Sequence, residues 1–523
     1  MTESHTPVLV VGGGPVGLTL SCLLSDQGVD HVLIESHPST SRHPKARGVS
    51  ARSMEILRRL GLEEEVRAAG LPAEQVHFYR GRDLVDPDYV RNGLAQEPGE
   101  GPEHTPSPGL ICSQDALEPL LLRRATELAG SRIRFATRLV SFEDDGLNVQ
   151  AVVEDRATGR LDHLRADWLV GCDGAASTVR TGAGIVMEGP VGLGRYLSVR
   201  FEAPLGEAVA DRASASYFLT VPGRGGFMAV DNDRHWIYQY PLGTDAETDP
   251  ADNELLADLV RTAAGIPDLD VTVHDTMTWR MDAQLAASYR RSHVLLAGDA
   301  AHVVPPTGGH GMNTGIGDAD NLAWKLAAVT AGYAGEALLD TYEAERRPIA
   351  RQIIDISTAN ATNRAGYRID DELLLTAAYR STAVIPDPKH TGKHEVLDPS
   401  GYRPSCRPGE RAPHVRLTPG PAGVTSTLDL VGPGLTLLTA DEDPRWQAQA
   451  EAVRQAGAPL TLRAVGTAGQ QEADPGQWAR LLGADHADTA LLVRPDGHIA
   501  WRGGLPADPT TLPALVRRVL ADR

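Results

Sequence analysis

Short apolar runs alternate with glycine-rich breaks in the amino-terminal part of the chain. The β-branched run Val8–Val11 has the composition of a buried parallel strand. A helix is predicted from Pro15 to Gln27, with Gly28 as its left-handed end, and a second strand is predicted at His31–Glu35. The order strand, helix, strand indicates a βαβ unit and therefore a mainly parallel sheet.

The pattern changes between residues 185 and 285, where helical periodicity fades and strand-like runs take its place. In the run His235–Tyr240, the residues Trp236, Tyr238 and Tyr240 share one face of the predicted strand. We expect an inserted, largely antiparallel sheet in this region. Its aromatic residues either form core or line a ligand pocket, and core packing is favoured because aromatic side chains usually supply burial first.

The parallel pattern resumes at His293–Leu296, and residues 318–329 carry an amphipathic helical stripe. Residues 386–422 are dense in proline and glycine, so a linker is expected there. Beyond them, predicted strands at 435–438, 460–465 and 490–493 alternate with helices at 444–455 and 512–521. The expected domains are a discontinuous nucleotide-binding domain (1–184 and 286–385), an inserted sheet domain (185–285) and a C-terminal domain (423–523).

Composition narrows the class of protein. The 523 residues carry a net charge of −19 with no long basic run, so binding to nucleic acid or to an anionic membrane is not expected. The four cysteines never form a C-x-x-C pair, which argues against a disulfide framework or a metal site and suits a reducing cytoplasm. The apolar stretch Val8–Leu24 lacks the positive start of a signal peptide, and no apolar run is long enough to cross a bilayer. A soluble cytoplasmic protein is expected.

A glycine motif follows the first predicted strand directly. Its glycines allow a tight turn and let a pyrophosphate approach the amide groups at the helix N-terminus. Glu35 ends the second strand, where a carboxylate accepts hydrogen bonds from a ribose and disfavours a 2′-phosphate, so NAD or FAD is favoured over NADP. Such a motif alone is often a packing turn, but strand, turn, helix and acid stand here in register. The residues assigned to cofactor binding are Gly12, Gly14, Pro15, Val16 and Gly17.

A second polar segment follows the strand at 293–296. Asp299 either holds another polar part of a cofactor or caps a helix, which an aspartate does equally well. The next turn favours the cofactor, because its glycines expose backbone amides that stabilise negative charge. A reduced flavin carries such charge on its pyrimidine side, so FAD fits. The cofactor-binding residues of this turn are Pro306, Gly308, Gly309, Gly311, Met312 and Asn313.

Several further segments match one family. They are Arg47–Leu57, Cys112–Gln114, Gly171–Gly174, Asn313–Leu326 and Tyr342–Pro348. With them the chain resembles the single-component (group A) flavoprotein aromatic hydroxylases of the p-hydroxybenzoate hydroxylase type, in particular the phenol and aromatic polyketide hydroxylases. The resemblance implies an α/β fold with a Rossmann-like FAD-binding domain, an inserted antiparallel β-sheet substrate domain and a C-terminal thioredoxin-like domain.

The resemblance also implies roles for single residues. Glu35 binds the adenosine ribose, and Arg47 and Gln114 lie at FAD. Asp299 holds the ribityl region, and the segment 308–313 meets the pyrimidine edge of the flavin.

The reaction implied is hydroxylation of a phenolic or polycyclic aromatic natural product with NAD(P)H and O2 through a flavin C4a-hydroperoxide, so the cofactor carries the hard step. No second G-x-G-x-x-G occurs, so NAD(P)H is expected to dock transiently. Asp173 belongs to a family segment that serves both FAD and NAD(P)H. The C-terminal domain has no C-x-x-C, which favours a structural role or homodimer formation over thioredoxin activity.

No catalytic side chain stands out. His302 and His310 are interpreted as structural or cofactor-contacting groups rather than proton carriers. The W-x-W-x-I-P segment of flavin halogenases is absent. Two other functions stay open: an FAD dehydrogenase or oxidase that needs no nicotinamide, and a flavin-bearing protein that only binds an aromatic ligand. Unranked candidates for activating a phenol are His235, Tyr238, Tyr240 and Arg280.

Overall fold

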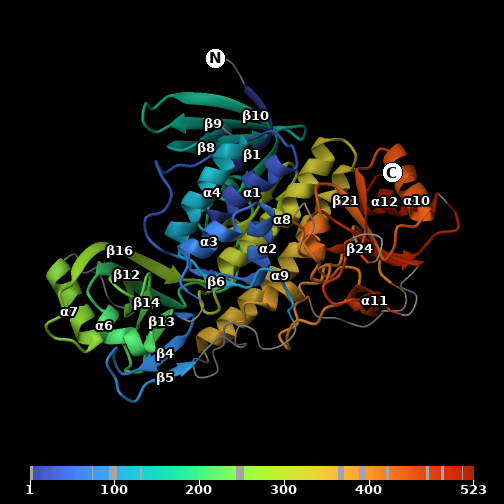
Figure 1. Ribbon diagram of the computed structural model, residues 1–523. Helices are drawn as coiled ribbons and strands as arrows, with labels where there is room; N and C mark the ends of the chain where they lie inside the picture. Colours follow the sequence, from blue (N-terminus) through green and yellow to red (C-terminus); the bar gives the residue numbers. More distant parts are fainter. Residues whose placement is uncertain are drawn as a thin grey trace.

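The computed structural model shows three parts, which Figure 1 displays as a central α/β part, a sheet at the lower left and a C-terminal part at the right. The structure describes residues 4–72, 75–92, 103–129, 132–242, 252–362, 370–387, 396–419, 423–466, 470–483, 488–508 and 510–522. The stretch 92–108 is rich in proline, glycine and glutamate, a composition that predicts a surface loop, and most of it lies outside these residues.

A largely parallel sheet with strand order β18-β19-β10-β1-β2-β7 forms the central part, and β8 and β9 extend it from β10. The middle strand β1 pairs with β2 on one side and with β10 on the other. Its residues Val8–Val11 are at most 6% exposed, which explains why this run is apolar without alternation. The strands are Ser4–Val11 (β1), His31–Ile34 (β2), Ile133–Arg134 (β7), Thr137–Asp144 (β8), Val149–Asp155 (β9), Leu161–Gly171 (β10), Arg290–Arg291 (β18) and Val294–Leu296 (β19).

Helices and short strand pairs complete the central part. Helix α1 packs against α4 and α8. Helix α9 continues through Pro348, although a proline inside a helix usually kinks or ends it. The helices are Pro15–Asp26 (α1), Ala51–Arg59 (α2), Glu63–Ala69 (α3), Gln114–Ala129 (α4), Thr178–Gly182 (α5), Gly311–Thr330 (α8) and Asp340–Thr362 (α9). The short strands are Gly48–Val49 (β3), Leu110–Ile111 (β6), Met187–Glu188 (β11), Gln284–Ala286 (β17) and His302–Val303 (β20).

The second part is a seven-stranded sheet with order β16-β12-β15-β14-β13-β4-β5. The sequence places this sheet within 185–285, but β4 and β5 come from residues 78–92, and β4 runs parallel to β13. A strand as short as β4 carries no local signal for its partner, so only the folded chain reveals this pairing. The elements are Phe78–Gly81 (β4), Val90–Asn92 (β5), Gly194–Glu202 (β12), Gly206–Val209 (α6), Ser216–Leu219 (β13), Gly226–Ala229 (β14), His235–Leu242 (β15), Asn253–Ala264 (α7) and Thr272–Met281 (β16).

The two faces of this sheet have different environments. One face holds a hydrophobic core with residues of α6 and α7, in which Trp236 and Tyr238 are 0% and 2% exposed and Tyr240 packs against them. Core packing is therefore the correct interpretation of these aromatic residues. The opposite face turns toward the central part, because the connection 42–47 lies against it: Arg47 donates to the Ser216 hydroxyl at 2.8 Å.

The C-terminal part is a four-stranded sheet with order β22-β21-β23-β24. Strands β21 and β22 are parallel, and the other pairs are antiparallel, which is a thioredoxin-like arrangement. Helices α10 and α12 pack in one core of this sheet and α11 in another. The elements are Leu435–Thr439 (β21), Pro444–Gln455 (α10), Leu460–Ala464 (β22), Gln477–Leu482 (α11), Thr489–Val493 (β23), Ile499–Gly504 (β24) and Thr511–Val519 (α12).

The segment 386–422 differs from the expected linker. In its described part Cys406, Val415 and Leu417 are at most 3% exposed and belong to the core that contains α11. Arg411 is also buried and forms an ion pair with Glu55 of α2. Apolar side chains between the prolines are buried, so the described residues of this segment are packed structure rather than an open connection.

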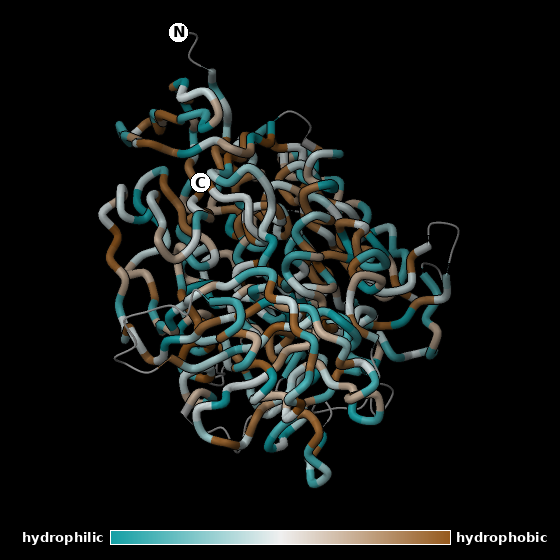
Figure 2. The backbone as a smooth tube through the Cα atoms, turned by 90° about the vertical axis from the view of Figure 1, so that its left-hand side faces the viewer, coloured by the Kyte–Doolittle hydropathy of each residue, from teal (hydrophilic) through white to brown (hydrophobic). Residues whose placement is uncertain are grey.

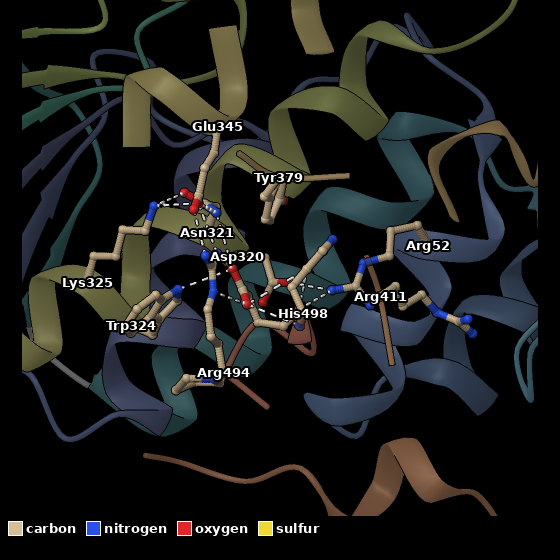
Figure 3. A network of polar contacts seen from close by, with 12 residues as sticks. Arg52, Asp320, Asn321, Trp324, Lys325, Glu345, Tyr379, Arg411, Arg494 and His498 are labelled. Atoms are coloured by element: carbon tan, nitrogen blue, oxygen red, sulfur yellow. Dashed lines mark hydrogen bonds and ion pairs between the residues drawn. The ribbon is translucent and has the colours of Figure 1, made fainter. Parts of the chain in front are cut away.

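A buried network of charges attaches the C-terminal part to the central part (Figure 3). Arg494, which follows β23, donates to Glu345 of α9 at 2.6 Å and 2.9 Å. Glu345 also accepts a hydrogen bond from Lys325 of α8 at 2.7 Å. These three side chains are completely buried.

The tip of the β23–β24 hairpin reaches two further helices. Arg52 of α2 donates to the Asp496 carbonyl at 2.6 Å and to Asp320 of α8 at 2.8 Å. Asn321 and Trp324 of α8 donate to the Asp496 carboxylate at 3.1 Å and 3.2 Å. The hairpin is thus fixed to α2, α8 and α9 together.

Hydrophobic and hydrophilic stretches alternate at short intervals through the molecule, as Figure 2 shows. Among the described residues, no helix combines the length and apolar character needed to cross a membrane.

Candidate active site

The register of the central sheet brings three distant segments to one edge. Val11 of β1 lies opposite Gly171 of β10, and Gly171 lies opposite Leu296 of β19. The three strands are parallel, so their carboxyl ends coincide and the segments that follow them are neighbours. In α/β sheets, ligands bind at this edge.

The glycines of the first segment have distinct structural reasons. Gly12 has φ +112°, and a Cβ there would lie 2.3 Å from the Cys172 carbonyl oxygen. A Cβ on Gly17 would lie 1.9 Å from the Gly12 carbonyl oxygen. Around Gly14, by contrast, a Cβ would meet no described atom within 4 Å, and no side chain caps α1 there. This open space beside free helix amides fits a pyrophosphate.

Glu35 follows β2 directly and is held by hydrogen bonds. The backbone N–H of Gly13 donates to one carboxylate oxygen at 2.6 Å, and that of His37 donates to the other at 2.8 Å. Burial acts to raise the pKa of Glu35, but these bonds and the His37 ring outweigh it and lower the pKa. The group is therefore an ionised acceptor at neutral pH, as a ribose site requires.

Asp299 is exposed to solvent within the short turn Gly298–Ala300. Desolvation by the surrounding protein nevertheless raises the pKa of Asp299 above its ordinary value. Among the described residues no hydrogen bond is made to its carboxylate, so it does not act as a helix cap. The Gly298 N–H donates instead to Asp318 of α8 at 3.1 Å.

Asn313 holds the glycine-rich turn 306–313 in place. Its amide donates to the carbonyl groups of Gly309 at 2.7 Å and Gly48 at 2.9 Å, and its oxygen accepts from the Ser50 N–H at 2.9 Å. Gly308 adopts φ +132°, which favours glycine. His310, which precedes α8, is buried, and burial lowers its pKa to about 4, so its ring is neutral.

A hollow lies beside this turn. It is bounded by the β3–β6 pair, by the turn and by the start of the second sheet. Apolar side chains and two carboxyl groups share its wall. The lining residues include Gly48, Val49, Val76, Phe78, Leu110, Ile111, Gly308, Gly309, His310, Asn313, Asp370 and Asp371.

Sequence reasoning missed part of this wall. Phe78 lies on β4, the strand whose pairing the sequence did not reveal, and Asp370 and Asp371 follow α9 without a motif. Burial, and then the neighbouring Glu372 and Asp370, raise the pKa of Asp371 to about 6. An acidic pair after a long helix was the only local signal available.

Comparison with known proteins identifies the family. Residues 5–357 match the FAD binding domain family, and residues 405–522 match the family described as aromatic-ring hydroxylase, C-terminal. The chain belongs to the FAD-dependent aromatic-ring hydroxylases.

Relatives of this hydroxylase match over their whole length. Tetracenomycin B2 monooxygenase-dioxygenase of Streptomyces olivaceus is 38% identical over 100% of both chains. Aklavinone 12-hydroxylase of Streptomyces purpurascens is 36% identical over 99% of this chain and 100% of its own. The solved flavin-dependent monooxygenase PieE, in complex with FAD and substrate, superposes with a TM-score of 0.92 at 31% identity and full coverage of both chains. Aklavinone-11 hydroxylase with FAD and aklavinone gives 0.87 at 35% identity, also with full coverage.

These findings confirm the predicted family, fold class and FAD cofactor. The hydroxylase is an FAD-dependent monooxygenase, one of a family for which NAD(P)H is the typical reductant. A dehydrogenase without nicotinamide and a passive ligand carrier, which the sequence left open, are thereby set aside.

The four candidate phenol activators do not line the hollow in the hydroxylase. Strand alternation directs Tyr238 and Tyr240 to the core face. His235 is half-exposed near Asp231, and the exposed Arg280 pairs with Asp282. Tyr238 and Tyr240 are thus part of the core, and His235 and Arg280 occupy exposed positions, so none of the four lies at the hollow.

Three other predicted residues, His302, Asp173 and Gln114, stabilise elements around the site. His302 is fully buried and contacts Asp318 at 2.7 Å, which fits a structural role. Asp173 accepts from Ser177 at 2.5 Å and from the Val179 N–H at 3.1 Å, so it holds the start of α5. Gln114 accepts from the Ala46 N–H at 3.2 Å and thereby positions the connection that leads to Arg47.

Proposed function

We propose that this hydroxylase adds oxygen to a polycyclic phenol of the aromatic polyketide type, with NAD(P)H and O2 as co-substrates. The glycine-rich turn 306–313 is called the flavin turn below. The hollow between this turn and the second sheet carries the proposal, because it joins an apolar wall to two carboxyl groups. Relatives named for tetracenomycin B2 and aklavinone support the polycyclic class.

The proposed cofactor contacts follow the geometry of the sheet edge. The pyrophosphate of FAD binds at residues 12–17, Glu35 binds the adenosine ribose and Asp299 binds the ribityl hydroxyls. The segment 306–313 meets the flavin ring. Arg47, Gln114 and Asp173 support these contacts from neighbouring connections.

The bound flavin supplies activated oxygen, and the protein positions the phenol for it. In the proposed complex the apolar wall, with Val76 and Phe78, excludes water from the ring. With a pKa raised to about 6, Asp371 is mainly ionised at neutral pH and accepts a hydrogen bond from the phenol hydroxyl.

We further propose that the substrate domain comprises residues 185–285 together with the strands from 78–92. The free cysteines of the described chain support a reducing, cytoplasmic location. A homodimer remains a prediction, which light scattering tests.

Rapid mixing tests the proposed function. The holoenzyme is mixed anaerobically with NADH or NADPH, with and without 1,8-dihydroxyanthraquinone as a phenolic probe, and flavin absorbance is followed. We expect the probe to accelerate flavin reduction, and admission of O2 to yield a product with one added oxygen atom. Reduction that no phenol accelerates, or hydrogen peroxide as sole product with every phenol tried, would contradict the proposal.

Glu35→Ala and Asp299→Ala are each expected to weaken FAD retention. Each variant removes an acceptor for cofactor hydroxyl groups, a loss of about 1–3 kcal/mol, or roughly 5- to 150-fold in Kd. FAD titration into apoprotein measures this loss. Glu451→Ala, which changes an exposed carboxylate of α10, is the control and should leave FAD affinity unchanged.

Cys406→Ser is expected to leave turnover unchanged. Burial raises the pKa of the Cys406 thiol to about 12, so the reactive thiolate is absent at neutral pH. Residues 423–523 contain no cysteine, so a redox role of the C-terminal domain would have to use this residue. Loss of turnover at normal FAD content would reveal such a role.

A further inference from the structure

An aromatic and amide group lies on the sheet face that turns toward the central part, outside the hollow. Tyr196 and Trp279 are stacked, with ring centroids 4.6 Å apart and planes at 16°. The Trp279 indole N–H donates to the side-chain oxygen of Gln239 at 3.0 Å. All three side chains are only partly buried. We refer to Tyr196, Gln239 and Trp279 as the Gln239 site.

The chain connects this site to the flavin turn. Trp279 lies near the end of β16, which leads into β17. Strand β17 pairs with β20, the strand that precedes the turn 305–311. The Gln239 site therefore lies at the end of the sheet from which the chain returns to the flavin turn.

Hydrogen bonding determines the orientation of the Gln239 amide. An indole N–H can only donate, so the atom that faces Trp279 must be the amide oxygen. The amide nitrogen then donates to the Ser198 hydroxyl at 2.9 Å. That hydroxyl is within 2.8 Å of the Nε2 atom of His43, to which it donates.

His43 fixes the other end of this chain of hydrogen bonds. Its Nδ1 atom lies 3.2 Å from a carboxylate oxygen of Asp275, which only accepts, so Nδ1 carries the proton and Nε2 is free to accept from Ser198. Burial lowers the pKa of His43 more than Asp275 raises it, in agreement with a neutral ring. Every donor from Trp279 to His43 thus points in one direction.

One N–H of Gln239 is left over. Its oxygen and one N–H are engaged, and no described residue accepts its second N–H. A partly buried donor without a partner, beside a stacked aromatic pair, matches a planar ligand that carries an oxygen acceptor.

Resting on the proposed function, we propose that Gln239 contacts the substrate and donates a hydrogen bond to a carbonyl or phenolic oxygen remote from the reacting ring. Tyr196 and Trp279 provide the aromatic surface for the fused rings. Ser198 and His43 are positioning residues, because they hold the amide with its free N–H toward the ligand. The site thereby selects polycyclic quinones and phenols over bare hydrocarbons.

The test compares two probes on the holoenzyme. The dissociation constants of 1,8-dihydroxyanthraquinone and of anthracene, which has the same three rings without oxygen, are measured by ligand or flavin spectral change. In Gln239→Leu we expect a rise of about five- to tenfold for the quinone, the value of one hydrogen bond, and none for anthracene. Trp279→Phe, which keeps the stacking but frees the amide, should shift quinone affinity in the same direction by less.

Gln455→Leu, on the exposed surface of α10, is the matched control and should change neither constant. Unchanged quinone affinity in Gln239→Leu, or an equal loss for both probes, would overturn the inference. FAD content and flavin reduction by NAD(P)H with a single-ring phenol are recorded in parallel. If wild-type enzyme hydroxylates phenols while Gln239→Leu binds the quinone normally, the inference fails and the proposed function stands.

Discussion

Gly14→Ala is expected to yield a folded apoprotein that has lost most of its FAD affinity. A Cβ at this position meets no described atom within 4 Å, and the Gly14 backbone (φ −78°, ψ −173°) suits alanine. The change in apoprotein stability should therefore stay within about 1 kcal/mol. The added methyl group occupies the space in which the pyrophosphate binds, and such crowding costs about 1–3 kcal/mol of binding, roughly 5- to 150-fold in Kd.

Gly17→Ala provides the contrast within the same motif. Its Cβ would lie 1.9 Å from the Gly12 carbonyl oxygen, so the strand–helix contact itself must open and the apoprotein should unfold more easily. FAD titration and urea unfolding of both apoproteins separate the two effects. Normal FAD affinity in Gly14→Ala would show that the pyrophosphate lies elsewhere.

Glu345→Ala is expected to destabilise the protein by about 3–5 kcal/mol, because it leaves buried cations without their partner. Arg494 and Lys325 are completely buried and both donate to this carboxylate. The loss should loosen the C-terminal part first, because Arg494 belongs to its hairpin and Glu345 to α9. Urea unfolding followed by circular dichroism measures the loss of stability. Limited proteolysis shows which part of the chain unfolds first.

Glu451→Ala serves again as the control, because this 53% exposed carboxylate pairs with a 43% exposed Arg454. Surface ion pairs contribute about 0–1 kcal/mol, so unfolding should hardly change. If Glu345→Ala unfolded as wild type does, the network would not hold the two parts together. Helix α8, which supplies Lys325 to the network, begins at Gly311 within the glycine-rich turn 306–313, so FAD affinity should fall along with stability in Glu345→Ala.

The cofactor motifs could be predicted because their information is local. The turn after β1 needs glycine at fixed spacing, and Glu35 ends the adjacent strand, so the pattern is legible in the sequence alone. The alternation of strands and helices in the C-terminal domain was also legible in the sequence, and the resemblance to the hydroxylase family implied that this domain is thioredoxin-like. The candidates for activating a phenol do not line the hollow, because residue type does not tell which side chains the folded chain brings to a site.

The sequence by itself determined the glycine-rich turns at 12–17 and 306–313, the βαβ start, the cofactor and the alternation of elements in the C-terminal domain. These features depend on backbone conformation and hydrophobic period within short stretches of chain. Only the tertiary structure decided that β4 extends the second sheet, that the proline-rich segment 396–419 is packed, and that Gln239 faces the central part with an N–H that no described residue accepts. These features depend on strand register and on contacts between residues far apart in the chain, and the lowest free energy of the whole fold selects them.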